Sequence, residues 1–150
     1  MGLKQNMKRA AQLYAHAAAA AHAPGQSKLG ECYYQGDGVK LDLATAAQWY
    51  RRAAEQGYPE SQSSLGMAFY NGSGVAQSYD DAVPWLCLAA AQDHGEALYF
   101  LGACYLGGKG VSGDELLNQS EALWLFKRSA AQGFAGAAEM VEKFVDLLTL

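Results

Sequence analysis

The chain matches itself at an offset of 36 residues. A Leu-Gly pair recurs at this spacing, at Leu29-Gly30, Leu65-Gly66 and Leu101-Gly102. A Gly-x-Gly-Val motif recurs at the same spacing, at residues 36–39, 72–75 and 108–111. Self-similarity at such a period is typical of solenoids, in which each unit buries its apolar face only by stacking on the next unit. The repeat therefore predicts a stacked array, which favours binding on a surface over binding in a closed pocket.

Each unit reads as two helices separated by the glycine motif. The first helix places small or apolar residues on one face at about 100° per residue. In the first unit these are Gly25, Leu29, Cys32 and Tyr33. The second helix shows the i, i+3, i+4, i+7, i+8 spacing of an amphipathic helix, with apolar residues at Ala46, Trp49, Tyr50, Ala53 and Ala54. The pattern predicts an all-α fold, a superhelical α/α solenoid of antiparallel helix pairs. The glycine of each Leu-Gly pair flanks the core face, so we expect a neighbouring helix to approach closely there.

We expect residues 1–150 to form a single repeat domain with about three full 36-residue units and a half-unit at each end. The expected segments are a half-unit at 6–24, repeats at 25–60, 61–96 and 97–136, and a C-terminal capping helix at 137–150. In the last helix Glu142 replaces the packing glycine, as expected of a cap on which no further unit packs closely.

Three irregularities give sharper expectations. The third repeat is longer than the others, and we place its four extra residues in a loop at 112–117, with Asn118 as the helix N-cap. Pro84 would interrupt a helix that starts after Ser78, so we expect that helix to begin nearer Asp80. Leu125 takes the core position at which the earlier units have tryptophan, which leaves the neighbouring Trp124 outside the core.

Charge and hydropathy exclude two classes of partner. Lys and Arg number 11 against 15 Asp and Glu, for a net charge of -4, so the chain lacks the basic face that nucleic acid requires. No apolar run reaches the roughly 18 residues of a membrane span. The Ala-rich stretch after Lys8 and Arg9 resembles a secretory signal peptide, but residues 10–14 match 46–50 in the repeat register. We therefore expect a repeat helix and a cytoplasmic protein; a signal peptide would make it periplasmic or secreted.

The residue types that carry chemistry do not form a recognisable set. Cys32 and Cys104 occupy the same repeat position two units apart, too far for a disulfide, so we expect reduced thiols. His22 and His94 share a repeat position with Tyr58 and Phe134, which favours a ring that fills a turn over a metal ligand. No Ser/His/Asp or Cys/His arrangement stands out. We expect no catalytic residue, no metal site and no cofactor.

The unit as a whole resembles the Sel1-like repeat, a bacterial and eukaryotic relative of the tetratricopeptide repeat. The resemblance rests on Leu-Gly-x-x-Tyr/Phe-x-x-Gly-x-Gly-Val followed by a cap residue and a second helix that ends in Ala-Ala-x-Gln-Gly. It implies an interaction scaffold without enzymatic activity. One branch of that family, small cysteine-rich secreted proteins, is associated with β-lactam binding or hydrolysis and carries a cysteine pair in each repeat. Cys32, Cys87 and Cys104 do not reproduce that pairing.

The first helices also carry a second stripe, opposite their core face, which includes Ser27 and Ser63 and is rich in Tyr and Met. By analogy with related solenoids, it lines the concave side. We predict that a protein or peptide partner binds there, through Lys28, Glu31, Tyr34, Gln35, Met67, Tyr70, Asn71, Tyr99 and Leu106. Three alternatives stay open. The tyrosines could fold over the next repeat, the chain could bind or hydrolyse a small ligand like the cysteine-rich branch, or the terminal half-units could form a homodimer.

Overall fold

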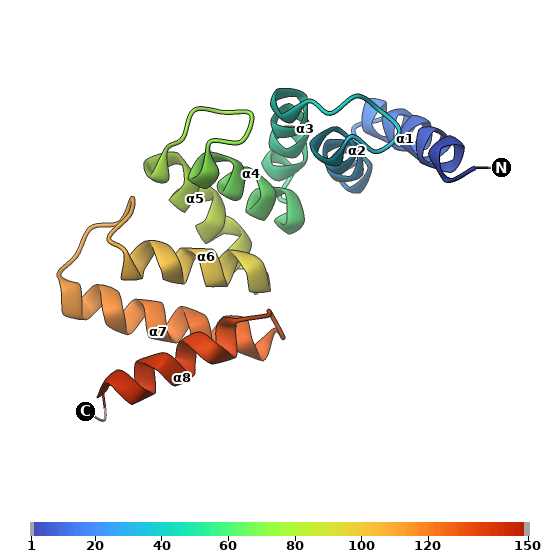
Figure 1. The fold of residues 1–150 in the computed structure, drawn as a ribbon. Helices are drawn as coiled ribbons and strands as arrows, with labels where there is room; N and C mark the ends of the chain where they lie inside the picture. Colours follow the sequence, from blue (N-terminus) through green and yellow to red (C-terminus); the bar gives the residue numbers. More distant parts are fainter. Residues whose placement is uncertain (1, 149–150) are drawn as a thin grey trace.

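The computed structural model describes residues 2–148, which form eight α-helices and contain no β-strand. The helices are α1 (Leu3–Ala19), α2 (Ala23–Gln35), α3 (Leu43–Glu55), α4 (Pro59–Asn71), α5 (Tyr79–Ala90), α6 (Gly95–Leu106), α7 (Glu115–Ala131) and α8 (Ala137–Leu148). They stack in chain order into one curved array with the two termini at opposite ends (Figure 1). The predicted all-α superhelix of helix pairs is confirmed. Of the predicted capping helix, residues 149 and 150 lie outside the described part of the chain.

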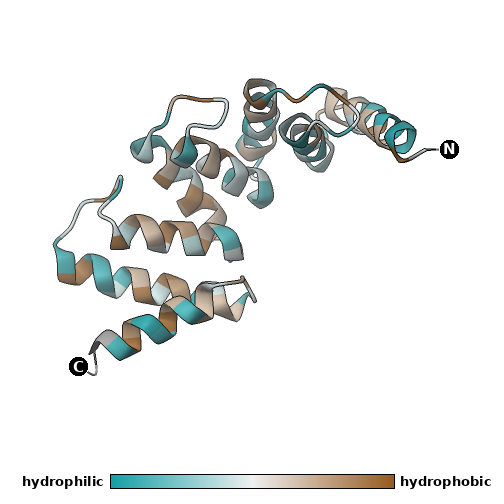
Figure 2. Ribbon diagram, viewed as in Figure 1, coloured by the Kyte–Doolittle hydropathy of each residue, from teal (hydrophilic) through white to brown (hydrophobic). Residues whose placement is uncertain are grey.

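Each helix packs on its neighbours in the sequence, and α4 also contacts α6. The first helices α2, α4 and α6 lie nearer the inside of the curve than the second helices α3 and α5 (Figure 1). A hydrogen bond joins two first helices directly, because the Ser63 hydroxyl donates to Glu96 Oε2 at 2.9 Å. The most hydrophobic helices are α5 and α6, near the middle of the array (Figure 2). Buried apolar residues form two main clusters, one on α3 and α4 and the other on α5, α6 and α7.

The glycines of the three Leu-Gly pairs mark where the two helices of a unit touch. A Cβ built on Gly66 would lie 2.8 Å from Leu86 Cγ, a distance that real Cβ atoms do not show. Gly30 faces the Tyr50 ring in the same way, and Gly102 faces the Phe126 ring. A large side chain of the second helix thus fills the space above each glycine. The predicted close approach is confirmed, and its packing offsets roughly 1 kcal/mol of lost helix propensity per glycine.

The four extra residues of the third repeat lengthen a helix, and the loop predicted at 112–117 is wrong in its second half. The N-cap of α7 is Asp114, whose Oδ1 accepts a hydrogen bond from the Leu117 backbone N–H at 2.8 Å. Asn118, the predicted cap, lies inside α7 and is buried. Four residues make about one helical turn, so the insertion extends α7 at its start without rotating the face that it buries.

The start of α5 is one residue earlier than the predicted Asp80, and Pro84 lies deeper in the helix than expected. The helix begins at Tyr79, because Ser78 Oγ accepts a hydrogen bond from the Asp81 backbone N–H at 3.2 Å. Pro84 therefore lies inside the helix, where it removes one backbone hydrogen bond. The cap and the two acidic residues of the first turn favour the helix N-terminus, and burial of Ala82, Leu86, Ala89 and Ala90 stabilises the helix across the proline.

Candidate functional site

A groove of about 200 Å³ opens between α3 and α4. We call it the α3–α4 groove. Its lining comes from three successive units: the end of α2, the α3–α4 helix pair with its glycine loop, and the first turn of α6. The larger lining residues are Tyr34, Leu43, Tyr50, Ser64, Met67, Asn71, Ser73 and Glu96, and the small ones are Ala46, Ala47 and Ala68. The alanines leave the space open, and the larger residues give it an aromatic, sulfur-containing and weakly polar wall.

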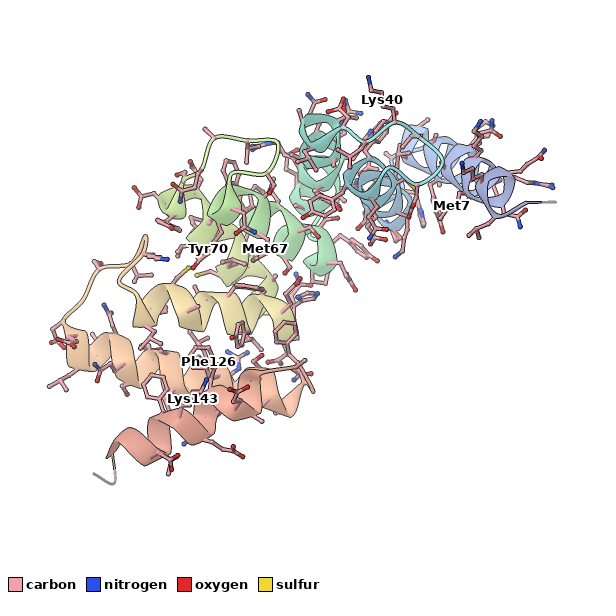
Figure 3. All side chains as sticks on the ribbon, in the orientation of Figure 1. Met7, Lys40, Met67, Tyr70, Phe126 and Lys143 are labelled. Atoms are coloured by element: carbon pink, nitrogen blue, oxygen red, sulfur yellow. The ribbon has the colours of Figure 1, made fainter. Side chains whose placement is uncertain are left out.

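Three residues of the predicted binding stripe line this groove. Tyr34 stands at the last turn of α2 and is 46% exposed. Met67 and Asn71 follow each other at i, i+4 on α4, so their side chains share one face. Figure 3 shows Met67 and Tyr70 on α4, near the space between α4 and α6. The helical periodicity in the sequence is what brings these residues to one side.

Three further predicted residues lie one unit earlier, on α2. A more open depression between α1 and α2 is lined by Lys28, Glu31 and Gln35, and its lining residues occupy repeat positions that also line the α3–α4 groove. Lys28 Nζ donates to Glu31 Oε2 at 2.8 Å, and this hydrogen bond raises the pKa of Lys28. The N-terminal copy of the groove is therefore more open to solvent and carries an exposed ion pair.

Tyr70 occupies the repeat position of Tyr34, but its surroundings differ. Its ring packs edge-on against Tyr79 with centroids 5.1 Å apart. Lys109 Nζ lies 5.3 Å from the Tyr70 centroid and 5.0 Å from the Tyr79 centroid, and it donates to Tyr70 Oη at 3.3 Å. Hydrogen bonds to both tyrosines raise the pKa of Lys109. In this unit the groove position is filled by the chain's own side chains.

Two residues of the predicted stripe lie apart from the groove. Tyr99 packs among aromatic rings at the junction of α6 with α7, with centroids 5.4 Å from Phe126 and 5.2 Å from Phe134. Leu106 is exposed at the C-terminal end of α6. The structure therefore does not bring Tyr99 and Leu106 together with Tyr34 and Met67.

The placement of Ser27 and Ser63 on the open stripe is wrong, since both are buried. The first helix of each unit packs not only on second helices but also against the next first helix, as the Ser63–Glu96 hydrogen bond shows. Serine fits such a contact because it is small and its hydroxyl finds an acceptor. The open part of the stripe is consequently narrower than the sequence suggests.

Sequence reasoning missed Tyr50 and Glu96 as groove residues. Tyr50 was assigned to the core, where it is indeed buried, but its side chain also lines the groove. Burial raises the pKa of Tyr50 far above its ordinary value, and the nearby Glu31, Tyr34 and Glu96 raise it further. Glu96 belongs to the next unit, so no pattern within one repeat points to it. The sequence offers one signal for the open groove. In the glycine loops, Ser73 stands at the repeat position of Lys109, so a short side chain replaces a long one there.

The two repeat-position histidines act as helix caps. His22 Nδ1 accepts a hydrogen bond from the Gly25 backbone N–H at 3.1 Å, and His94 Nδ1 accepts one from the Ala97 backbone N–H at 3.4 Å. Within residues 2–148, no cluster of three or more His, Cys, Asp or Glu side chains is arranged to hold a metal ion. In the same part of the chain, none of the helices has the length and apolar character needed to cross a bilayer.

The Sel1 repeat model matches four consecutive segments, residues 1–22, 23–58, 59–94 and 95–134. The chain belongs to the Sel1 repeat family. Sel1 repeats are generally protein–protein interaction modules, and their scaffolds are typically not catalytic. No functionally curated protein matches the chain.

Solved structures agree with the Sel1 repeat fold. A protective antigen of uropathogenic Escherichia coli with an SLR fold is 32% identical, with a TM-score of 0.76 over 83% of this chain and 26% of that one. A Sel1 repeat protein from Oxalobacter formigenes is also 32% identical, with a TM-score of 0.80 over 90% of this chain and 52% of that one. Cysteine rich protein B of Helicobacter pylori shares the fold. It is 21% identical, with a TM-score of 0.68 over 93% of this chain and 97% of that one. This Sel1 repeat chain thus spans about a quarter of the Escherichia coli antigen and about half of the Oxalobacter formigenes protein.

Proposed function

We propose that this Sel1 repeat chain is a non-enzymatic scaffold that binds an extended segment of a protein partner along its inner face, with the α3–α4 groove as the main contact. One observation carries the proposal. The groove stays open between Tyr34 and Met67, while the equivalent position of the next unit is filled by Tyr79 and Lys109. Aromatic and Met side chains are enriched where proteins meet, so an open position with these walls favours a partner.

The residues around the groove suit a peptide chain. The exposed Tyr34 ring and the Met67 side chain offer apolar surface to a partner side chain. The amide of exposed Asn71 has both donors and an acceptor for a peptide backbone. Lys28 and Gln35 would extend the contact by one unit toward the N-terminus, and Leu106 would extend it toward the C-terminus. Tyr70 would contribute only the part of its ring that Lys109 and Tyr79 leave uncovered.

The test is selection of a phage-displayed random peptide library on the native chain, followed by affinity measurement on variants. We expect the selected peptides to bind Tyr34→Ala/Met67→Ala about tenfold or more weakly, because truncating two central contact residues removes at least about 1.4 kcal/mol of binding free energy. Trp124→Ala is the matched control, since Trp124 is an exposed aromatic that does not line the groove. Its affinity should equal that of the native chain.

Equal binding by the groove variant and the native chain would reject the groove as the contact surface. A library that yields no binder would reject peptide recognition by this face. Binding lost in Trp124→Ala but kept in Tyr34→Ala/Met67→Ala would move the contact to the outer surface.

A thiol titration separates this proposal from the ligand-binding or hydrolytic alternative of the cysteine-rich branch. Cys32, Cys87 and Cys104 are all free, with Cys87 alone exposed. We expect three thiols to react with a disulfide reagent in denaturant, and Cys87 to react first in the folded protein. Burial raises the pKa of Cys104 to about 11. Its reactive thiolate is then about one part in a thousand at pH 8. A count below three would indicate a disulfide and contradict a reduced scaffold.

A further inference from the structure

The third copy of the groove shows which kind of group fills this position. There the ammonium of Lys109 lies within 5.3 Å of the Tyr70 ring centroid and within 5.0 Å of the Tyr79 centroid, and it donates a hydrogen bond to Tyr70 Oη. The ammonium stands at the hydroxyl end of the Tyr70 ring, within the roughly 6 Å at which a cation and an aromatic centroid attract each other. In this copy the chain itself supplies a positive charge beside the two rings.

The α3–α4 groove has the same backbone but lacks that cation. One unit earlier, Tyr34 takes the place of Tyr70 and Ser73 takes the place of Lys109. The two loop positions are held alike, because the Ser73 N–H donates to the Ala68 carbonyl at 2.8 Å and the Lys109 N–H donates to the Cys104 carbonyl at 2.8 Å. Serine is too short to reach the ring from that position. Consequently Tyr34 stays 46% exposed beside an open space.

The charges around this space are negative. Glu96 lines the groove, and its Oε2 is held by the Ser63 hydroxyl at 2.9 Å. Glu31 and Glu96 both raise the pKa of the buried Tyr50, after burial itself, but Glu31 is already paired with Lys28 at 2.8 Å. Glu96 is therefore the carboxylate that remains for a partner cation. None of the described residues that line the groove is a lysine or an arginine. The whole chain has a net charge of -4, which favours a basic segment at long range.

We infer that the α3–α4 groove holds a lysine or arginine side chain of the partner, placed against the Tyr34 ring and paired with the Glu96 carboxylate. The inference rests on the proposed function and names the chemistry of the partner, a basic peptide segment. Met67 and Leu43 pack on the methylene part of the inserted side chain, since long basic residues keep their stems on apolar surface. Asn71 and Ser73 also line the groove, where they accept or donate hydrogen bonds to the backbone of the basic segment or to the N–H groups of the inserted side chain.

The test uses three blocked tripeptides, acetyl-Gly-Xaa-Gly-amide with arginine, norleucine or glutamate at the centre, and follows the methyl signals of ¹³C-labelled methionines by NMR. Met67 lines the groove and Met140 on α8 does not, so one is the reporter and the other the internal control. Each peptide is titrated to about 10 mM, because we expect a single anchored side chain to bind with a Kd of about 1 mM. We expect the arginine peptide to shift Met67 in a saturable manner, and the norleucine and glutamate peptides to leave it in place.

Two variants and one matched control connect that response to the named residues. Glu96→Gln keeps the oxygen that accepts from Ser63 but removes the charge, and we expect the Kd for the arginine peptide to rise about tenfold. Ser73→Lys introduces the lysine of the third copy, which should occupy the position and abolish the Met67 shift. Glu60→Gln removes the charge of the equivalent residue of α4, which is exposed and does not line the groove. It should bind like the native chain.

A Met67 shift of equal size with norleucine and arginine, or no Met67 shift with arginine at about 10 mM, would overturn the inference. An unchanged Kd for the arginine peptide in Glu96→Gln, together with an unchanged Met67 shift in Ser73→Lys, would also overturn it.

The proposed function is tested separately, with the peptides selected from the library. Selected peptides that lack a basic residue but bind Tyr34→Ala/Met67→Ala more weakly than the native chain would support the proposed function and reject the inferred cation site. An arginine response without any groove-dependent library peptide would reject the peptide partner and keep the cation site.

Discussion

Replacing Gly74 with alanine should lower the free energy of unfolding by about 2–5 kcal/mol. Gly74 has a φ of +74° in the loop between α4 and α5, where an L side chain costs about 1–2 kcal/mol. A Cβ there would also collide with the backbone carbonyl of Leu43, at the start of α3. A backbone group cannot swing aside as a flexible side chain can, so the loop itself has to move. Urea denaturation followed by circular dichroism measures the loss.

Gly57→Ala is the matched control for Gly74→Ala. Gly57 has a φ of +87°, and nothing lies within 4 Å of a Cβ built on it. It therefore isolates the cost of the backbone conformation, about 1–2 kcal/mol. Equal losses in the two variants would show that the loop relaxes freely and that its contact with Leu43 contributes nothing. Because Leu43 and Ser73 line the α3–α4 groove, we also expect Gly74→Ala to weaken binding of the selected peptides and Gly57→Ala to leave it unchanged.

The second large effect is expected from Phe126→Ala, which should cost about 3–5 kcal/mol. Phe126 of α7 is fully buried and lies against Gly102. Its ring, labelled in Figure 3, has its centroid 5.4 Å from that of Tyr99 on α6 and 6.1 Å from that of Phe144 on α8. Since a solenoid unit contacts only its neighbours, the damage should be local. Hydrogen exchange should accelerate most in α6, α7 and α8 and least in α1 and α2.

Trp124→Ala is the control for Phe126→Ala, with a larger aromatic removed two positions away. Trp124 is 52% exposed, and the guanidinium of Arg128 lies 4.5 Å from its ring centroid. An exposed stacking contact of this kind contributes at most about 1 kcal/mol. A loss in Trp124→Ala as large as that in Phe126→Ala would mean that the exposed face of α7 supports the array as much as its buried face does.

The repeat period and the helix periodicity were enough to predict the architecture. The 36-residue spacing of the Leu-Gly pairs predicted which glycines touch a second helix, and Gly66 against Leu86 shows that contact. The same register predicted that Leu125 and not Trp124 enters the core, and Leu125 is buried. The differences at Asn118 and Asp80 both concern helix starts. A four-residue insertion can extend either a helix or a loop, and a capped helix either tolerates a proline or starts later. Local sequence does not decide between the two outcomes in either case.

The candidate site was predictable only in part. Tyr34 and Met67 were found because their repeat positions lie on one face of the first helices, and Asn71 because its polar side chain suits a peptide backbone. Tyr50 and Glu96 were missed because the groove is assembled from three successive units. A pattern compared within one repeat cannot show which residues of the preceding and following repeats come to the same space.

The sequence by itself determined the two-helix unit and the main core face of each helix, because these follow from periodicity and small residues. It also placed Tyr34 and Tyr70 at one equivalent position. Only the tertiary structure decided that the groove beside Tyr34 is open and that the one beside Tyr70 is closed. Stacking brings Lys109 onto a ring 39 residues earlier in the chain, whereas the equivalent Ser73 is too short to reach its own tyrosine.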